Sequence, residues 1–142
     1  MKLIPTGIEN FKELIDKDYY YVDKTNLIVN IINEKVVLYT RPRRFGKTLN
    51  MSMLYYFFSI KEKKNSYLFN HLNISKNIDA LKHQNKYPTI FISLKDMKVP
   101  SMENQLLNFS SIIARLLDQF EDILDYDIFN DREKTLLNKY HM

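Results

Sequence analysis

Cysteine is absent from this chain of 142 residues, and glycine occurs only twice, at Gly7 and Gly46. The absence of cysteine excludes disulfide scaffolds, iron–sulfur clusters, cysteine zinc sites and thiol catalysis. It is also compatible with a reducing, cytoplasmic compartment. The three histidines, at positions 71, 83 and 141, lack the spacing of metal ligands. An average composition would supply about ten glycines, so each of the two present marks a backbone position of interest.

Long apolar runs are also missing. No stretch approaches the roughly 20 apolar residues that a membrane span requires, and residues 1–8 do not resemble a signal peptide. We therefore expect a soluble protein with no membrane partner. The chain is 45% hydrophobic and 13% aromatic, which suffices for the core of one domain covering residues 1–142.

Positive charge is concentrated in the first two-thirds of the chain. The net charge is +4, but residues 1–98 contain 17 Lys and Arg against 9 Asp and Glu, whereas residues 99–142 contain 4 against 8. An anionic ligand is therefore expected to bind the first part of the chain.

Hydrophobic periodicity predicts helices that alternate with strands. Two continuous apolar runs, residues 36–40 and 89–94, are typical of strands buried on both faces of a parallel sheet. The order of elements predicts an α/β layered domain with a parallel sheet. Helices are predicted after the N-caps Asn10, Asp23, Ser101 and Asn130, and from Lys47 to Phe58. Residues 65–87 show only one helical turn, near residues 79–83.

The informative motif is Arg41-Pro42-Arg43-Arg44-Phe45-Gly46-Lys47-Thr48, which lies between the first predicted strand and a predicted helix. A phosphate-binding loop has this setting: backbone N–H groups surround the anion, and the helix directs its positive end at it. Lys47 would reach the β- and γ-phosphates of ATP, and the Thr48 hydroxyl would ligate Mg²⁺. Gly46 stands where the backbone must approach phosphate closely. The predicted cradle comprises Arg43, Arg44, Phe45, Gly46, Lys47 and Thr48.

Arg41 stands where the full Gly-x4-Gly-Lys-Ser/Thr pattern has its first glycine. The residues alone therefore leave a second interpretation open, in which the loop is a solvated basic turn. Arg43 and Arg44 could contact phosphates, stabilise charge across the subunit boundary of a homo-oligomer, or form structural ion pairs.

The chain resembles the predicted AAA-ATPase-like family of bacterial proteins. The resemblance rests on Pro5-Thr6-Gly7-Ile8, Tyr20-Tyr21-Val22-Asp23-Lys24-Thr25 and residues 38–49, and it continues weakly to residue 93. Members carry an N-terminal P-loop ATPase domain, commonly followed by a PD-(D/E)XK nuclease-like domain. The family has arginine at the position of Arg41. The resemblance thus implies ATP and Mg²⁺ as ligands and a P-loop NTPase-like fold.

Some family features are not found. His71 stands where members tend to have glycine, and Ser93 replaces an acidic residue. A Walker B strand, an apolar run followed by two acids, is not recognisable before Met142, and the nearest sequence, residues 123–127, is typical of a helix end and loop. We therefore expect the chain to be the N-terminal part of a longer protein or a truncated copy, without the nuclease-like domain.

Several residues have two interpretations. Asp23 and Lys24 could border the nucleotide site, although a helix N-cap also explains Asp23. The tyrosine run at 19–21 and the aromatic residues 55–58 could stack a base, but core packing explains them as well. Two other functions remain open: a nucleic-acid or protein interaction module that has lost nucleotide binding, and a nucleotide or small-molecule kinase.

Overall fold

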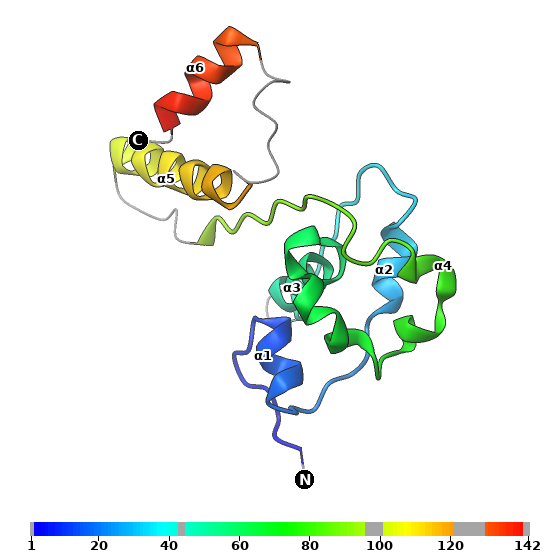
Figure 1. Cartoon of the computed structure of the whole chain (residues 1–142). Helices are drawn as coiled ribbons and strands as arrows, with labels where there is room; N and C mark the ends of the chain where they lie inside the picture. The colour runs from blue at the N-terminus through cyan, green and yellow to red at the C-terminus, as the bar shows by residue number, and fades with distance from the viewer. Residues whose placement is uncertain (1, 43–44, 96–100, 121–129, 141–142) are drawn as a thin grey trace. The chain divides into compact units, whose positions relative to one another are not determined.

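The computed structural model describes residues 2–42, 45–95, 101–120 and 130–140. The chain divides into two compact units, Met1–Phe91 and Ile92–Met142. The described helices of the first unit follow one another as α1, α2, α3, η1, η2 and α4 (Figure 1). Their bounds are Phe11–Asp16, Asn26–Ile31, Lys47–Phe58, Ile60–Phe69, Asn73–Lys76 and Ile78–Leu81, where η1 and η2 are 3₁₀ helices.

Aromatic side chains form the centre of the first unit. Phe11 of α1, Phe57 of α3 and Phe69 of η1 are fully or almost fully buried. The Phe11 and Phe69 rings stack with centroids 5.2 Å apart, and Phe57 meets Phe69 edge-on at 5.1 Å. Ile28 of α2 and Met53 of α3 belong to the same buried cluster. Phe57 therefore has the core position that the sequence favours, while Tyr20 remains more than half exposed.

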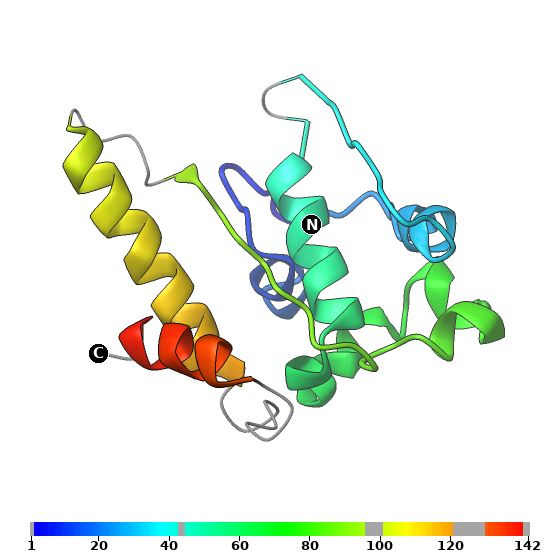
Figure 2. The same ribbon diagram turned by 90° about the horizontal axis from the view of Figure 1, so that it is seen from above.

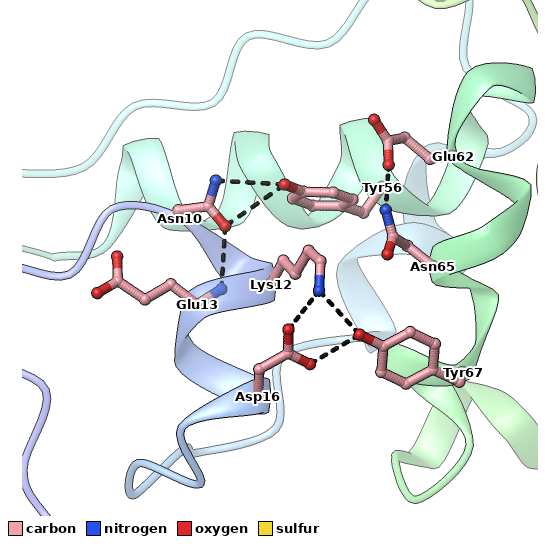
Figure 3. Close-up of polar contacts among 8 residues, drawn as sticks. All are labelled: Asn10, Lys12, Glu13, Asp16, Tyr56, Glu62, Asn65 and Tyr67. Carbon is pink, nitrogen blue, oxygen red and sulfur yellow. Dashed lines mark hydrogen bonds and ion pairs between the residues drawn. The ribbon is translucent and has the colours of Figure 1, made fainter.

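Polar contacts join α1 to its neighbours, as Figure 3 shows. The Asn10 side chain accepts a hydrogen bond from the N–H of Glu13 at 3.0 Å, which confirms Asn10 as the N-cap of α1, and it also contacts the Tyr56 hydroxyl. Across the other side of the helix, Lys12 pairs with Asp16 and donates to the Tyr67 hydroxyl at 2.9 Å. Tyr67 in turn donates to Asp16 at 2.8 Å, so η1 is fastened to α1.

The prediction of an α/β, P-loop NTPase-like layered fold with a parallel sheet is wrong. No strand or sheet occurs among the described residues, where the one parallel bridge joins Ser59 to Tyr87. The two expected strands have no regular secondary structure, and most of their apolar side chains lie in solvent: Val36 is 88% exposed, Leu38 87% and Ile90 63%. A continuous apolar run indicates a buried strand only where another strand satisfies its backbone groups, and neither segment has such a neighbour among the described residues.

The segment that the sequence left unassigned folds into short helices, of which η1 packs on α3 and η2 packs on α2 and α4. Asn77 caps α4 by accepting from the N–H of Ala80 at 3.0 Å. Asn85, at φ 53°, is almost fully buried, and its side chain donates to the carbonyls of Tyr56 and Ser59 at the C-terminal end of α3. These contacts hold the C-terminal end of α3 in place.

The second unit contains α5, Met102–Phe120, and α6, Asp131–Tyr140, which lie beside each other (Figures 1 and 2). Both helices are where the sequence predicts them. Asn130 and Glu133 form the expected capping box, with reciprocal hydrogen bonds of 2.9 Å. Among the described residues, no helix is both long and apolar enough to cross a membrane.

Candidate functional site

The helix α3 begins where the sequence predicts it, directly after Gly46. Gly46 has φ 75° and ψ 25°, a left-handed conformation that glycine adopts without the penalty of a Cβ atom. The N–H of Asn50 donates to the Gly46 carbonyl at 2.9 Å and closes the first turn. Because glycine has no side-chain oxygen, it leaves the first N–H groups of α3 to other acceptors. Such an N-terminus is suited to an anion.

Lys47 and Thr48 line a recess of about 670 Å³. Both are exposed residues of the first turn of α3. The other lining residues are Gly46 and, from the N-terminal segment, Pro5, Thr6, Gly7 and Glu9. The volume lies within the range of small-molecule sites, roughly 300–1,000 Å³. Residues from two blocks that support the sequence resemblance, 5–8 and 38–49, thus meet at one recess.

Among the described residues that line this recess, Glu9 is the acidic one. The sequence does not single it out, because an isolated glutamate has no characteristic spacing and reaches the site only through the fold. Its carboxylate and the Thr48 hydroxyl are oxygen groups of the kind that Mg²⁺ accepts. Within the described ranges, no three His, Cys, Asp or Glu side chains gather as a metal-binding group.

Of the remaining predicted cradle residues, the structure describes Phe45 but not Arg43 or Arg44. Arg43 and Arg44 lie outside the described residues, as do residues 123–127. Phe45 is 60% exposed and lines a second recess of about 380 Å³. The other residues of this second recess are Lys24, Leu27, Asn30, Tyr39, Arg41 and Asn50.

Arg41, at the first position of the loop, is anchored to Tyr39. The guanidinium carbon lies 5.5 Å from the centre of the Tyr39 ring. The Arg41 guanidinium beside the Tyr39 hydroxyl is the main cause that holds the pKa of Tyr39 below its usual value. Asn50, which is 1% exposed, donates to the same hydroxyl at 2.9 Å. The start of the loop is therefore tied to the first turns of α3 by side chains, whereas a glycine at position 41 would lack this anchor.

Asp23 joins two helices and does not cap α2 as expected. The helix begins at Asn26, with Thr25 in the N-cap position. One Asp23 oxygen accepts from the N–H and hydroxyl of Thr25, and the other accepts from the N–H of Asn73 at 2.6 Å. Burial opposes ionisation, but these hydrogen bonds hold the pKa of Asp23 below its usual value. Asp23 thus fastens the start of η2 beside the start of α2.

Comparison with known proteins finds a family and a relative that are similar to this chain. The family described as a predicted AAA-ATPase matches residues 5–140 of the chain. An uncharacterized protein in the vnfD 5′ region of Azotobacter chroococcum mcd 1 is 42% identical over 55 residues, which are 37% of this chain and 11% of that protein. The chain therefore matches only a small part of the length of that relative. No solved structure matches.

Proposed function

We propose that this chain, which belongs to the predicted AAA-ATPase family, binds ATP with Mg²⁺ through the loop of residues 41–48. Membership of the family confirms the resemblance seen in the sequence and supports a general ATPase-like role. The more specific proposal, that the nucleotide binds to this loop, rests on the geometry around Gly46.

The observation that carries the proposal is the start of α3. A left-handed glycine precedes a helix of 12 residues, and the next two residues, Lys47 and Thr48, line a recess. The N–H groups of the first turn and the helix dipole favour negative charge there. The Lys47 ammonium adds a full positive charge, which suits the β- and γ-phosphates.

The oxygen groups of the recess fit Mg²⁺. The ion usually keeps several waters and takes one or two carboxylates together with substrate phosphates. In the proposal, the Thr48 hydroxyl and the Glu9 carboxylate contribute from the protein. When bound, Mg²⁺ would neutralise part of the phosphate charge and fix the orientation of the phosphate chain. Lys47 and the first-turn N–H groups would hold the phosphate oxygens from the protein side.

A second candidate function is an interaction module for protein or nucleic acid. Exposed apolar side chains on residues 36–38 and 90–94 favour it, because single-chain proteins rarely leave such segments in solvent without a role. This function predicts no stabilisation by ATP. A nucleic-acid partner would in addition be retained through the basic first part of the chain in a salt-sensitive way.

Thermal unfolding of the purified chain separates the two functions. ATP at ten times its dissociation constant should stabilise the native state by about 1.4 kcal/mol, or roughly 5–10 °C for a unit of this size. The stabilisation should be greater with Mg²⁺ than with a chelator, and adenosine should give much less. Salt-sensitive retention on DNA or RNA together with no shift by ATP would favour the interaction module instead.

A further inference from the structure

Lys24 reaches the loop from a different part of the chain. A Cβ atom built on Gly46 would stand 3.9 Å from the Lys24 ammonium nitrogen, although 22 positions separate the two residues. Lys24 itself lies just before α2 and is exposed. Its charged end therefore lies beside the glycine that precedes Lys47, at the point where the proposed phosphate site begins.

The backbone on both sides of Lys24 is held in place. The N–H of Lys24 donates to the hydroxyl of Tyr21 at 3.2 Å, and that hydroxyl also contacts the sulfur of Met53 in α3. On the other side, Thr25 is fully buried, and its hydroxyl accepts from the N–H of Ile74 at 3.2 Å. The main chain around Lys24 is thus fixed against α3 and η2, while the side chain extends toward the loop.

The surroundings of Lys24 are positive. The second recess has Lys24 and Arg41 among its lining residues and no carboxylate among those that the structure describes. The neighbouring Asp23 uses both oxygens for hydrogen bonds to Thr25 and Asn73. Two cations thus line one recess, and one of them, Lys24, lies close to a left-handed glycine at a helix N-terminus. This arrangement generates a potential that favours a polyanion.

We propose that Lys24 is a further phosphate-binding residue, which contacts the phosphate chain across the loop from Lys47. The inference deepens the proposed function and rests on it for the identity of the ligand. It assigns a chemical task to the Tyr-Val-Asp-Lys-Thr block: Tyr21, Asp23 and Thr25 position the backbone, and Lys24 supplies the charge. The ligand is recognised at this point by its phosphate groups and not by its base.

Substitution of Lys24 tests the inference with inorganic tripolyphosphate and ATP as probes. Lys24→Gln removes the charge and leaves the backbone hydrogen bond to Tyr21 intact. Lys63→Gln is the matched control, because Lys63 is an exposed lysine of η1 that lines neither recess. Calorimetric titration at fixed ionic strength should show that Lys24→Gln weakens both probes by about tenfold or more, as expected for loss of one charged hydrogen bond. Lys63→Gln should stay within about twofold, and Lys24→Arg should recover much of the affinity.

The outcomes separate this inference from the proposed function. Wild-type binding of both probes with unchanged affinity in Lys24→Gln would overturn the inference and leave nucleotide binding standing. Binding of tripolyphosphate that depends on Lys24, without tighter binding of ATP, would support the inference and count against ATP as the ligand. Failure of the wild-type chain to bind either probe would overturn both. Urea unfolding of Lys24→Gln should match the wild type, so that a loss of affinity does not reflect a loss of folding.

Discussion

Gly46→Ala tests the loop geometry directly, because Gly7 has the same φ of 75° and serves as its matched control. An L-residue in the left-handed region costs about 1–2 kcal/mol. Alanine also lowers the entropy of the unfolded chain, which offsets about 0.4–1 kcal/mol of that cost. Either substitution should therefore destabilise the first unit by about 1 kcal/mol, which lowers its Tm by roughly 4–8 °C.

The two glycines differ in what a new methyl group would meet. At Gly46 it would lie 3.9 Å from the Lys24 ammonium, which is ordinary van der Waals contact, whereas at Gly7 nothing lies within 4 Å. Sterics therefore add little to either stability loss. Binding of ATP should weaken in Gly46→Ala by about tenfold or more, because the new methyl group would occupy space beside the ammonium where the proposed phosphate lies. Gly7 lines the same recess, so Gly7→Ala is a control for stability and not for binding.

Urea unfolding and calorimetric ATP titration of both variants provide the two readouts. Gly46→Asn adds a check on the backbone, since asparagine tolerates the left-handed region and should lose less stability than alanine. If Gly46→Ala is as stable as the wild type, residue 46 does not have the left-handed conformation in solution. If Gly46→Ala binds ATP as tightly as the wild type, the loop is not the phosphate site.

Three further substitutions test other parts of the account. Burial raises the pKa of Tyr21 to about 12, so the wild type should lose stability as the pH rises from about 10 to 12. Urea unfolding of Tyr21→Phe should lack that loss, and parallel alkaline stability profiles of the two proteins would contradict the buried position of Tyr21. Hydrogen bonds hold the pKa of Asp23 low despite its burial, so its contribution to stability is present at neutral pH and lost below about pH 4. Asp23→Asn should flatten that loss of stability in acid, and an unchanged loss would show that other carboxylates cause it. Glu9→Gln should reduce the enhancement of ATP binding by Mg²⁺ by about threefold or more without weakening metal-free ATP; an unchanged enhancement in calorimetry would exclude Glu9 as a metal-site residue.

Local signals in the sequence predicted the elements whose determinants lie within a few residues. Asn10 caps α1, Asn130 and Glu133 cap α6, and Gly46 precedes α3, all as expected. In each case the cap residue and the first turn interact within three or four positions, so the pattern contains the necessary information. The long amphipathic helix α5 was predicted for the same reason.

Contacts between residues far apart in the sequence explain where the predictions of structure were wrong or incomplete. The apolar run at residues 36–40 matches a buried strand in composition, but pairing depends on a partner elsewhere, and sequence alone does not supply it. Asp23 looks like a local N-cap, yet its second oxygen binds the N–H of Asn73, 50 positions away. The short helices of residues 60–81 likewise depend on distant contacts, such as that of Asn85 with the end of α3.

The residues of the candidate site also fall into two groups, those that a local motif predicts and those that only the fold brings to the site. Gly46, Lys47 and Thr48 were predicted because one short motif contains them, and the structure places all three along one recess. Glu9 lines the same recess, and Lys24 lies beside Gly46, because the chain folds back on itself. Glu9 has no spacing that could have revealed its place, whereas the Tyr-Val-Asp-Lys-Thr block already indicated that Lys24 could border the nucleotide site.

The affinity of the chain for Mg²⁺-ATP in wild type and Lys47→Ala is the most direct test of the central claim. Lys63→Ala provides the control for loss of one positive charge, because this exposed lysine lines neither recess. We expect saturable binding to the wild type and to Lys63→Ala, with a loss of about tenfold or more in Lys47→Ala. Equal affinity in wild type and Lys47→Ala, or no binding by the wild type, would contradict it.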